Sequence, residues 1–186
     1  MQNYILEAYL LSDETIIIDF DKFKRGGRLF IIGFAGSGKS SIGYSLWHKY
    51  KMNVCTLDDA WAKDGEPYKD AKGVWKNFVA NADNMMFDML NNKQRCRVVE
   101  GIQLLYPPLE QYALPIMMRE ACVIMGKSAI KSAFDAARRN KKEYGMSFKG
   151  SFKAVFKTNR QMLKHIDDFR KKRIKAAKTV EPFKLF

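Results

Sequence analysis

The run of eight residues Gly33-Phe34-Ala35-Gly36-Ser37-Gly38-Lys39-Ser40 combines three glycines with a lysine and a hydroxyl group. It fits the pattern G-x-x-x-x-G-K-[ST] without a mismatch. Glycines let the backbone curl so that successive N–H groups point inward, and the start of a following helix adds partial positive charge. We therefore expect a loop that binds phosphate groups, in which Lys39 reaches the β- and γ-phosphates of a nucleotide and Ser40 ligates Mg²⁺.

Three carboxylates follow expected strands at the points where those strands end. Asp58 and Asp59 come directly after the run 54–57, and Glu100 ends the run 97–99. Because ligands of open parallel sheets bind at the carboxyl ends of the strands, we expect these groups to converge on the rim that carries the loop. There a carboxylate could serve as a base towards a hydroxyl or bind the metal. A turn or helix cap for the aspartates, and a cap or ion pair for Glu100, is the simpler alternative.

The eight-residue run resembles the Walker A element of P-loop NTPases, a superfamily of switches, motors and kinases. Leu57-Asp58-Asp59-Ala60-Trp61 resembles the Asp-Asp-aromatic element of small P-loop kinases, and polynucleotide 5′-kinases carry such a pair after their second strand. The stretch VVEGIQLL, residues 98–105, is similar to the Ile-Glu-Gly-x-x-Leu-Leu stretch of uridine-kinase-like and nicotinamide-riboside-kinase-like enzymes. The resemblance covers about residues 28–140 and includes phage-encoded kinases of this size. The usual Asp-x-x-Gly of Walker B is absent.

The resemblance implies a role for each matched residue. The nucleotide, with ATP expected as the cofactor, would be bound by Gly33, Ala35, Gly36, Ser37, Gly38, Lys39, Ser40 and Ser41. Mg²⁺ would be bound by Ser40, Asp58 and Glu100. The catalytic set would be Lys39, Asp58, Asp59, Glu100, Arg138 and Arg139. One aspartate of the pair would be the general base, with Asp58 slightly favoured over Asp59.

Small kinases also carry arginines on a mobile lid that closes over the phosphates. Arg138 and Arg139 end a predicted helix in a position similar to that lid, with Lys142 in place of a second spaced arginine. The segment 140–150 adds further lysines and two glycines, which would supply cations and hinge freedom. A basic connection between two helices, with no catalytic role, is the alternative.

The excess positive charge lies entirely in the last third of the chain. Residues 1–125 contain 15 Lys+Arg and 15 Asp+Glu, whereas residues 126–186 contain 18 and 5, which gives the whole net charge of +13. Such a segment attracts polyanions, among them nucleotide phosphates, nucleic acid or an anionic membrane surface, unless it is only a solvated helix. Phe148, Phe152 and Phe156 recur at helical spacing among these lysines; they could stack on bases, but we expect a core stripe.

The order of the predicted elements indicates a single α/β domain over residues 1–186. Strands alternate with helices, with strands expected at 15–19, 28–32, 53–57, 97–100 and 121–125 and helices at 39–51, 74–90, 128–140 and 151–175. This alternation predicts a mostly parallel sheet covered on both faces, and with the loop it favours a three-layer P-loop NTPase fold. The core would span about 28–130, and the basic lid with the C-terminal helix about 131–175.

Three connections complete this picture. Glycines at 26 and 27 predict a turn, so that the first two strands would form an N-terminal hairpin at the edge of the sheet. Pro107-Pro108 predicts a loop, and the tail 179–186 would add a strand or cap the core.

Composition excludes several classes of protein. No apolar run approaches the roughly 20 residues that span a bilayer, and residues 1–11 lack the features of a secretory signal. Three cysteines lie in apolar stretches, Cys55, Cys96 and Cys122, and we interpret them as reduced core thiols of a cytoplasmic protein rather than a disulfide framework or metal site. Two histidines are too few to indicate a zinc site.

Three functions remain open on these grounds. The first is an ATP- and Mg²⁺-dependent kinase that phosphorylates a hydroxyl of a nucleoside, nucleotide or related small molecule. The second is a kinase whose acceptor hydroxyl belongs to DNA or RNA, either at a 5′ end or on a hydroxymethylated base. The third is an ATPase, or a nucleotide-dependent binding module, without any acceptor. The sequence does not identify the acceptor, and it does not indicate an oligomeric state.

Overall fold

The computed structural model describes residues 14–57, 62–63, 66–67, 96–126 and 128–182. Within them, six strands form one mixed sheet in the order β3-β6-β2-β7-β1-β8. A separate two-stranded ribbon consists of β4 (Ala62–Lys63) and β5 (Glu66–Pro67). The chain is therefore an α/β protein, as its element order predicts. The predicted helix at 74–90 lies outside the described residues.

Four central strands are parallel. They are β3 (Val54–Thr56), β6 (Val98–Glu100), β2 (Leu29–Ile32) and β7 (Ala121–Ile124). β1 (Ile16–Ile18) pairs antiparallel with β7, and β8 (Val180–Pro182) pairs antiparallel with β1. The mostly parallel sheet is confirmed, and the C-terminal tail supplies its outer strand.

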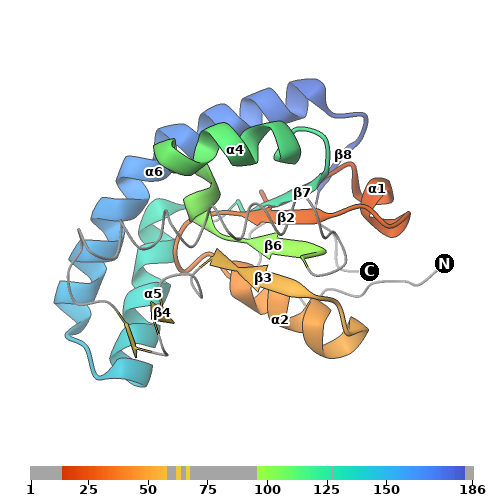
Figure 1. Ribbon diagram of the computed structural model, residues 1–186. Coiled ribbons are helices and arrows are strands. Elements are labelled where there is room, and N and C mark those ends of the chain that lie inside the picture. Colours follow the sequence, from red (N-terminus) through yellow and green to blue (C-terminus); the bar gives the residue numbers. More distant parts are fainter. Residues whose placement is uncertain (1–13, 58–61, 64–65, 68–95, 127, 183–186) are drawn as a thin grey trace.

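Helices cover both faces of this sheet (Figure 1). The described helices are α1 (Phe20–Lys24), α2 (Lys39–Tyr50), α4 (Pro107–Met117), α5 (Ala129–Tyr144) and α6 (Phe148–Ala176), with a 3₁₀ turn at Ile102–Leu105. Alternate residues of β2 point to opposite faces. Leu29 and Ile31 pack with α1 and α2, whereas Phe30 and Ile32 pack with α4 and α6. Strands buried on both faces read as continuous apolar runs, which is why this sequence signal is strong.

The N-terminal edge hairpin was a wrong prediction. Between the two strands the chain forms α1, whose Phe23 is buried in the core beside α2. Asp19 turns the chain with a left-handed backbone, at φ 52°, and β1 then pairs with β7 rather than β2. A short amphipathic turn that buries one phenylalanine thus replaces the expected β-turn.

The expected loop at Pro107-Pro108 is also absent, because these two residues begin α4. Proline is well tolerated in the first turn of a helix, where its missing N–H leaves no hydrogen bond unmade. α4 covers the sheet on the same face as α6.

The interpretation of the cysteines was wrong for two of the three. Cys55 and Cys96 form a disulfide, with their Cα atoms 5.5 Å apart. Cys55 lies in β3, and Cys96 lies two residues before the neighbouring strand β6. Cys122 in β7 is a free, buried thiol, as predicted, and its burial raises its pKa to about 12.

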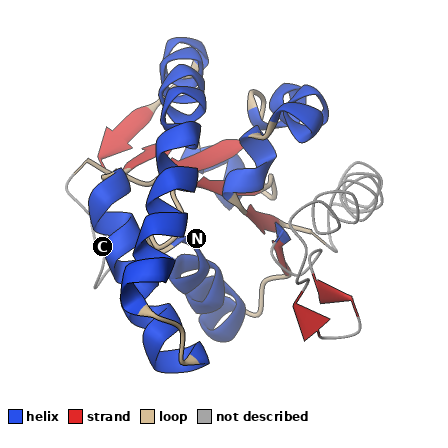
Figure 2. Cartoon of the chain, turned by 90° about the vertical axis from the view of Figure 1, so that its left-hand side faces the viewer, coloured by secondary structure: helices blue, strands red, loops and turns tan. Residues whose placement is uncertain are grey.

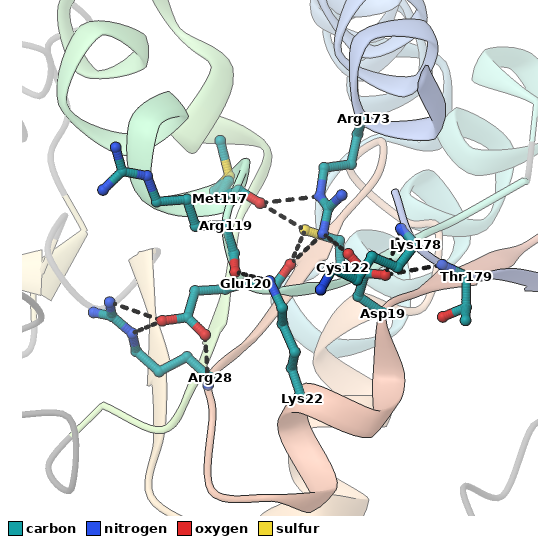
Figure 3. Close-up of polar contacts among 10 residues, drawn as sticks. All are labelled: Asp19, Lys22, Arg28, Met117, Arg119, Glu120, Cys122, Arg173, Lys178 and Thr179. Atoms are coloured by element: carbon teal, nitrogen blue, oxygen red, sulfur yellow. Dashed lines mark hydrogen bonds and ion pairs between the residues drawn. The ribbon is translucent and has the colours of Figure 1, made fainter. Parts of the chain in front are cut away.

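A buried polar network joins Asp19, which follows β1, to α6, to the residues after α6 and to the segment before β7 (Figure 3). Arg173 of α6 is fully buried and donates to Asp19 Oδ2 at 2.8 Å, to the carbonyl oxygen of Glu120 at 2.7 Å and to that of Met117 at 3.2 Å. The other carboxylate oxygen of Asp19 accepts from the backbone N–H groups of residues 178 and 179, at 2.9 and 3.0 Å. The network fixes α6 and β8 against β1.

Candidate functional site

The glycine-rich loop connects β2 to α2, as the motif requires. Gly36 and Gly38 adopt φ values of +83° and +99°, a region that favours glycine, and Gly38 is the residue that caps α2. Lys39, the first residue of α2, is almost fully buried and its ammonium group donates to the carbonyl oxygen of Phe34 at 2.9 Å. The lysine is thereby folded back over the loop. The first turn of α2 presents the amide groups and positive dipole end that suit an anion.

Asn159 of α6 holds the loop in place, and no sequence pattern indicated this role. Its side chain is fully buried. Its Oδ1 accepts from the N–H of Ala35 at 3.1 Å, and its Nδ2 donates to the carbonyl oxygens of Ala35 and Ala129, both at 3.3 Å. The Ala35 amide, which was a predicted nucleotide contact, is therefore bonded to Asn159. One side chain ties the loop to the start of α5.

α5 lies directly against the tip of the loop. A Cβ built on Gly36 would come within 2.1 Å of the carbonyl oxygen of Ser132 and 2.9 Å of the Cβ of Ala136. The close approach of α5 therefore depends on glycine at this position. Ser37, the next residue, is fully buried, and its N–H donates to the carbonyl oxygen of Phe34 at 3.0 Å.

A hollow of about 290 Å³ opens between the loop and α5. Its lining combines predicted residues of the loop and of the lid, namely Gly36, Gly38, Lys39, Ser40, Ser41, Arg138 and Arg139, with Asp135 and Ala136. The structure thus brings both predicted arginines to the predicted phosphate loop. Arg138 lies over the ring of Phe134 at 5.9 Å, and Arg139 lies 4.0 Å from Glu143, so the two exposed side chains extend along α5. Asp135 was not predicted; it adds a carboxylate to the wall of the hollow.

Glu100 lies at the carboxyl end of β6, next to β2. It is buried, and its Oε1 accepts from the hydroxyl of Thr56 at 3.1 Å. A Cβ built on Gly43 of α2 would lie 3.8 Å from the Cγ of Glu100, so the glutamate side chain packs against α2. Ser40 lies one helical turn before Gly43, and residues three apart share a helix face. The metal role of Glu100 and Ser40 stays a prediction.

Asp58 and Asp59 lie outside the described residues. The strand that precedes them, β3, is parallel to β6 and pairs with it in the register Thr56 to Glu100. Among the described residues no group of three or more His, Cys, Asp or Glu side chains could hold a metal ion. A metal site at Glu100 therefore needs further ligands from outside them or from a bound nucleotide.

The segment predicted to form the lid is a helical hairpin. α5 continues to Tyr144, Gly145 ends it with φ +64°, and α6 begins at Phe148, so Gly150 lies inside the first turn of α6. The N–H group of the Asn140 amide donates to the Ser151 hydroxyl at 2.8 Å and joins the two helices. In Figure 2, which looks from the side of this hairpin, the two helices stand in front of the sheet.

A second hollow of about 450 Å³ lies on the other side of the loop, beside Phe34. Its lining is mainly apolar, from Met125 after β7, Ile130 of α5, and Phe156 and Leu163 of α6. Arg160, Arg170 and Asp167 stand at its edge. The loop is thus flanked by a cationic hollow and an apolar one.

No family model matches the sequence, and no curated protein or solved structure matches it at a significant level. What can be inferred about function therefore depends on the loop and its surroundings. Among the described residues, no helix is both long enough and apolar enough to cross a membrane.

Proposed function

We propose that the protein is an ATP- and Mg²⁺-dependent phosphotransferase that moves the γ-phosphate to a hydroxyl group of a nucleoside, nucleotide or related small molecule. One observation carries the proposal. The loop with its buried Lys39 and the two arginines of α5 line a single hollow, although they come from segments about a hundred residues apart. Cations and amides that converge in this way suit a polyphosphate chain.

The topology supports the same site. The helix after β2 packs on one face of the sheet, whereas the 3₁₀ turn and α4 after β6 pack on the other face. β2 and β6 are neighbours, so the crevice at their carboxyl ends is the point where the connections diverge. Open α/β sheets bind their ligands at such points. The loop and Glu100 flank this crevice.

We assign the side chains of the site the following roles. The ammonium group of Lys39 would exchange the Phe34 carbonyl oxygen for phosphate oxygens, and Arg138 and Arg139 would neutralise charge on the transferring group. Ser40 and Glu100, with Asp58, would hold Mg²⁺, which would neutralise phosphate charge when bound. Asp58 or Asp59 would accept the proton of the attacking hydroxyl. The apolar hollow beside Phe34 offers a place for the base of the nucleotide.

The test is transfer of radiolabelled γ-phosphate to a panel of acceptors: nucleosides, nucleoside monophosphates, and DNA or RNA with and without a 5′-hydroxyl. We expect Lys39→Ala to lower transfer by about 100-fold or more, because it removes the charge that faces the phosphates. Lys131→Ala, an exposed lysine of α5 away from the hollow, is the matched control and should leave transfer unchanged.

A double variant separates the kinase from an ATPase without an acceptor. Asp58→Asn with Asp59→Asn should abolish transfer and preserve ATP binding, measured by calorimetry. If instead the purified chain hydrolyses ATP with no acceptor and the double variant still does so, the phosphotransferase proposal is wrong. If the wild-type chain shows no Mg²⁺-dependent ATP binding, both the kinase and the ATPase are ruled out.

A further inference from the structure

The first half of α6 carries a regular row of aromatic rings and cations. Phe148, Phe152 and Phe156 recur every four residues, and each is followed directly by a lysine. No acidic residue occurs between Glu143 and Asp167. We call Phe134 together with these three phenylalanines and the cations Lys149, Lys153, Lys157 and Arg160 the aromatic–lysine row.

The rings of this row form a continuous series. Phe148 and Phe152 are stacked with centroids 6.3 Å apart and planes inclined by 14°, and Phe152 and Phe156 with centroids 5.8 Å apart and planes inclined by 4°. Phe134 of α5 meets Phe148 edge-on at 5.2 Å. Since an α-helix rises 1.5 Å per residue, the three rings of α6 span about 12 Å along its axis.

The row does not belong to either apolar core. The core residues of α6 begin at Met162 and continue with Ile166 and Phe169, in the second half of the helix. The three phenylalanines of the first half are only half-buried, and Phe134 is 46% exposed. The expectation of a core stripe is therefore not met, and four rings remain partly open to solvent.

Positive charge accompanies the rings along the same stretch. The side chains of Lys149, Lys153, Lys157 and Arg160 are exposed. Among the described residues, a hollow of about 470 Å³ is lined by Lys153, Phe156, Lys157, Arg160 and Gln161. An exposed surface that alternates aromatic faces with cations matches a chain that alternates bases with phosphates. A duplex offers such a surface only its phosphates, because its bases are already stacked.

We propose that the aromatic–lysine row binds single-stranded nucleic acid, with phosphates on the cations and bases against the rings. Arg138, which lies over Phe134 at 5.9 Å, also lines the hollow beside the phosphate loop. The row therefore begins where the loop's hollow ends. Strand binding does not depend on the proposed phosphotransferase function.

The test is fluorescence anisotropy of a labelled oligothymidylate of about 20 nucleotides. It is titrated with the full chain, without ATP, at several salt concentrations. Lys153→Ala with Lys157→Ala should weaken binding at 0.1 M salt by about tenfold and reduce the slope of log affinity against log salt by about 1.4, at roughly 0.7 per lost phosphate contact. The matched control is Lys171→Ala with Lys172→Ala, two exposed lysines at the far end of the same helix, which should change neither quantity.

Aromatic variants test the base contacts. Phe152→Leu with Phe156→Leu keeps apolar volume on the helix but removes the ring faces, so circular dichroism should be unchanged while oligothymidylate binding falls by about tenfold. Ile174→Ala, an exposed apolar residue at the far end of the same helix, is the control. The proposal would be overturned if the chain bound a duplex or anionic phospholipid vesicles as tightly as oligothymidylate. It would also be overturned if the control variants lost binding and the row variants did not. If the chain binds the oligonucleotide but does not bind ATP, the proposal for the aromatic–lysine row stands and only the phosphotransferase proposal is refuted.

Discussion

Asn159 shows how a single distant side chain can shape a binding loop. The oxygen and the nitrogen of its side-chain amide both form hydrogen bonds, three in total, to the backbone of residues 35 and 129. It bonds to the backbone of Ala35, a predicted nucleotide contact, so it acts by positioning the loop. A buried backbone group left without a partner costs about 1–3 kcal/mol, which makes this residue a sensitive probe of the loop.

We expect Asn159→Ala to lower the free energy of unfolding by about 2 kcal/mol and to weaken ATP binding by about tenfold, because the loop loses its clamp. Denaturant unfolding and calorimetric titration measure the two effects. Asn140→Ala removes the hydrogen bond to Ser151 between the same two helices, away from the loop. It should cost stability but leave ATP affinity unchanged. Equal ATP affinity for the Asn159 variant and the wild type would show that the clamp is only structural.

Gly36 and Gly26 form a matched pair for separating backbone strain from steric overlap. Both have positive φ, at +83° and +96°. A Cβ at Gly26 would meet nothing within 4 Å, whereas one at Gly36 would overlap the Ser132 carbonyl oxygen at 2.1 Å. Gly26→Ala should therefore cost only about 1 kcal/mol of left-handed strain. Gly36→Ala should cost more than about 3 kcal/mol, or displace α5 from the loop. Thermal unfolding of the two variants compares them directly, and similar losses would contradict the close packing of α5.

At the scale of elements, α6 is held to the sheet by charge as well as by its apolar face. Burial alone would raise the pKa of Asp19, but the hydrogen bond from Arg173 and those from two backbone amides outweigh it and leave this pKa below the ordinary 3.8. A carboxyl group whose pKa is lower in the folded state stabilises the fold above the pKa of the unfolded chain. That contribution disappears as the pH falls through the folded value.

Asp19→Asn is the variant that tests this attachment, since asparagine tolerates the left-handed backbone at this position. At pH 7 we expect the variant to be less stable than the wild type by about 2 kcal/mol, the usual value of a hydrogen bond to a charged group. The difference should persist down to about pH 4 and shrink below it, as the wild-type carboxyl group becomes protonated. Urea unfolding from pH 2.5 to 7 measures it. A difference that stays constant at low pH would contradict the lowered pKa.

The parts of the fold that the sequence predicted correctly are those encoded locally. The loop, its flanking strand and helix, and the four central strands follow from patterns within short, continuous runs of the chain. Several of the errors involve partners far along the chain. The pairing of β1 with β7, the Cys55–Cys96 disulfide and the clamp of Asn159 each join segments that lie 41 to 124 residues apart. No local pattern specifies such a partner, because the neighbour is chosen by the sheet order.

At the scale of the whole molecule, the two ends of the parallel strands have different roles. The candidate binding site lies at their carboxyl ends, and buried polar contacts that stabilise the fold lie at their amino ends. The loop follows β2 and Glu100 ends β6, so both lie at the carboxyl ends of the parallel strands. Arg28 and Glu120, which are joined by hydrogen bonds of 3.2 and 3.3 Å, precede β2 and β7 and lie at the amino ends. The network of Asp19 and Arg173 lies at this second end, and Figure 1 shows α1 and the turn between α5 and α6 at opposite ends of the molecule.

A chain that ends at Ala176 tests whether these two ends are independent. It lacks β8 and the two amides that donate to Asp19, so we expect it to lose about 3 kcal/mol of stability. Its ATP affinity, measured well below its melting temperature, should stay within about twofold of the wild type, because additivity holds for sites that share no contacts. Asn159→Ala should differ from the truncation, because it lowers ATP affinity by about tenfold as well as stability. If the truncated chain instead keeps a native circular dichroism spectrum but no longer binds ATP, the two ends of the sheet are not independent. In that case the loss of β8 affects the loop through α6 and Asn159, and the two ends form one cooperative unit.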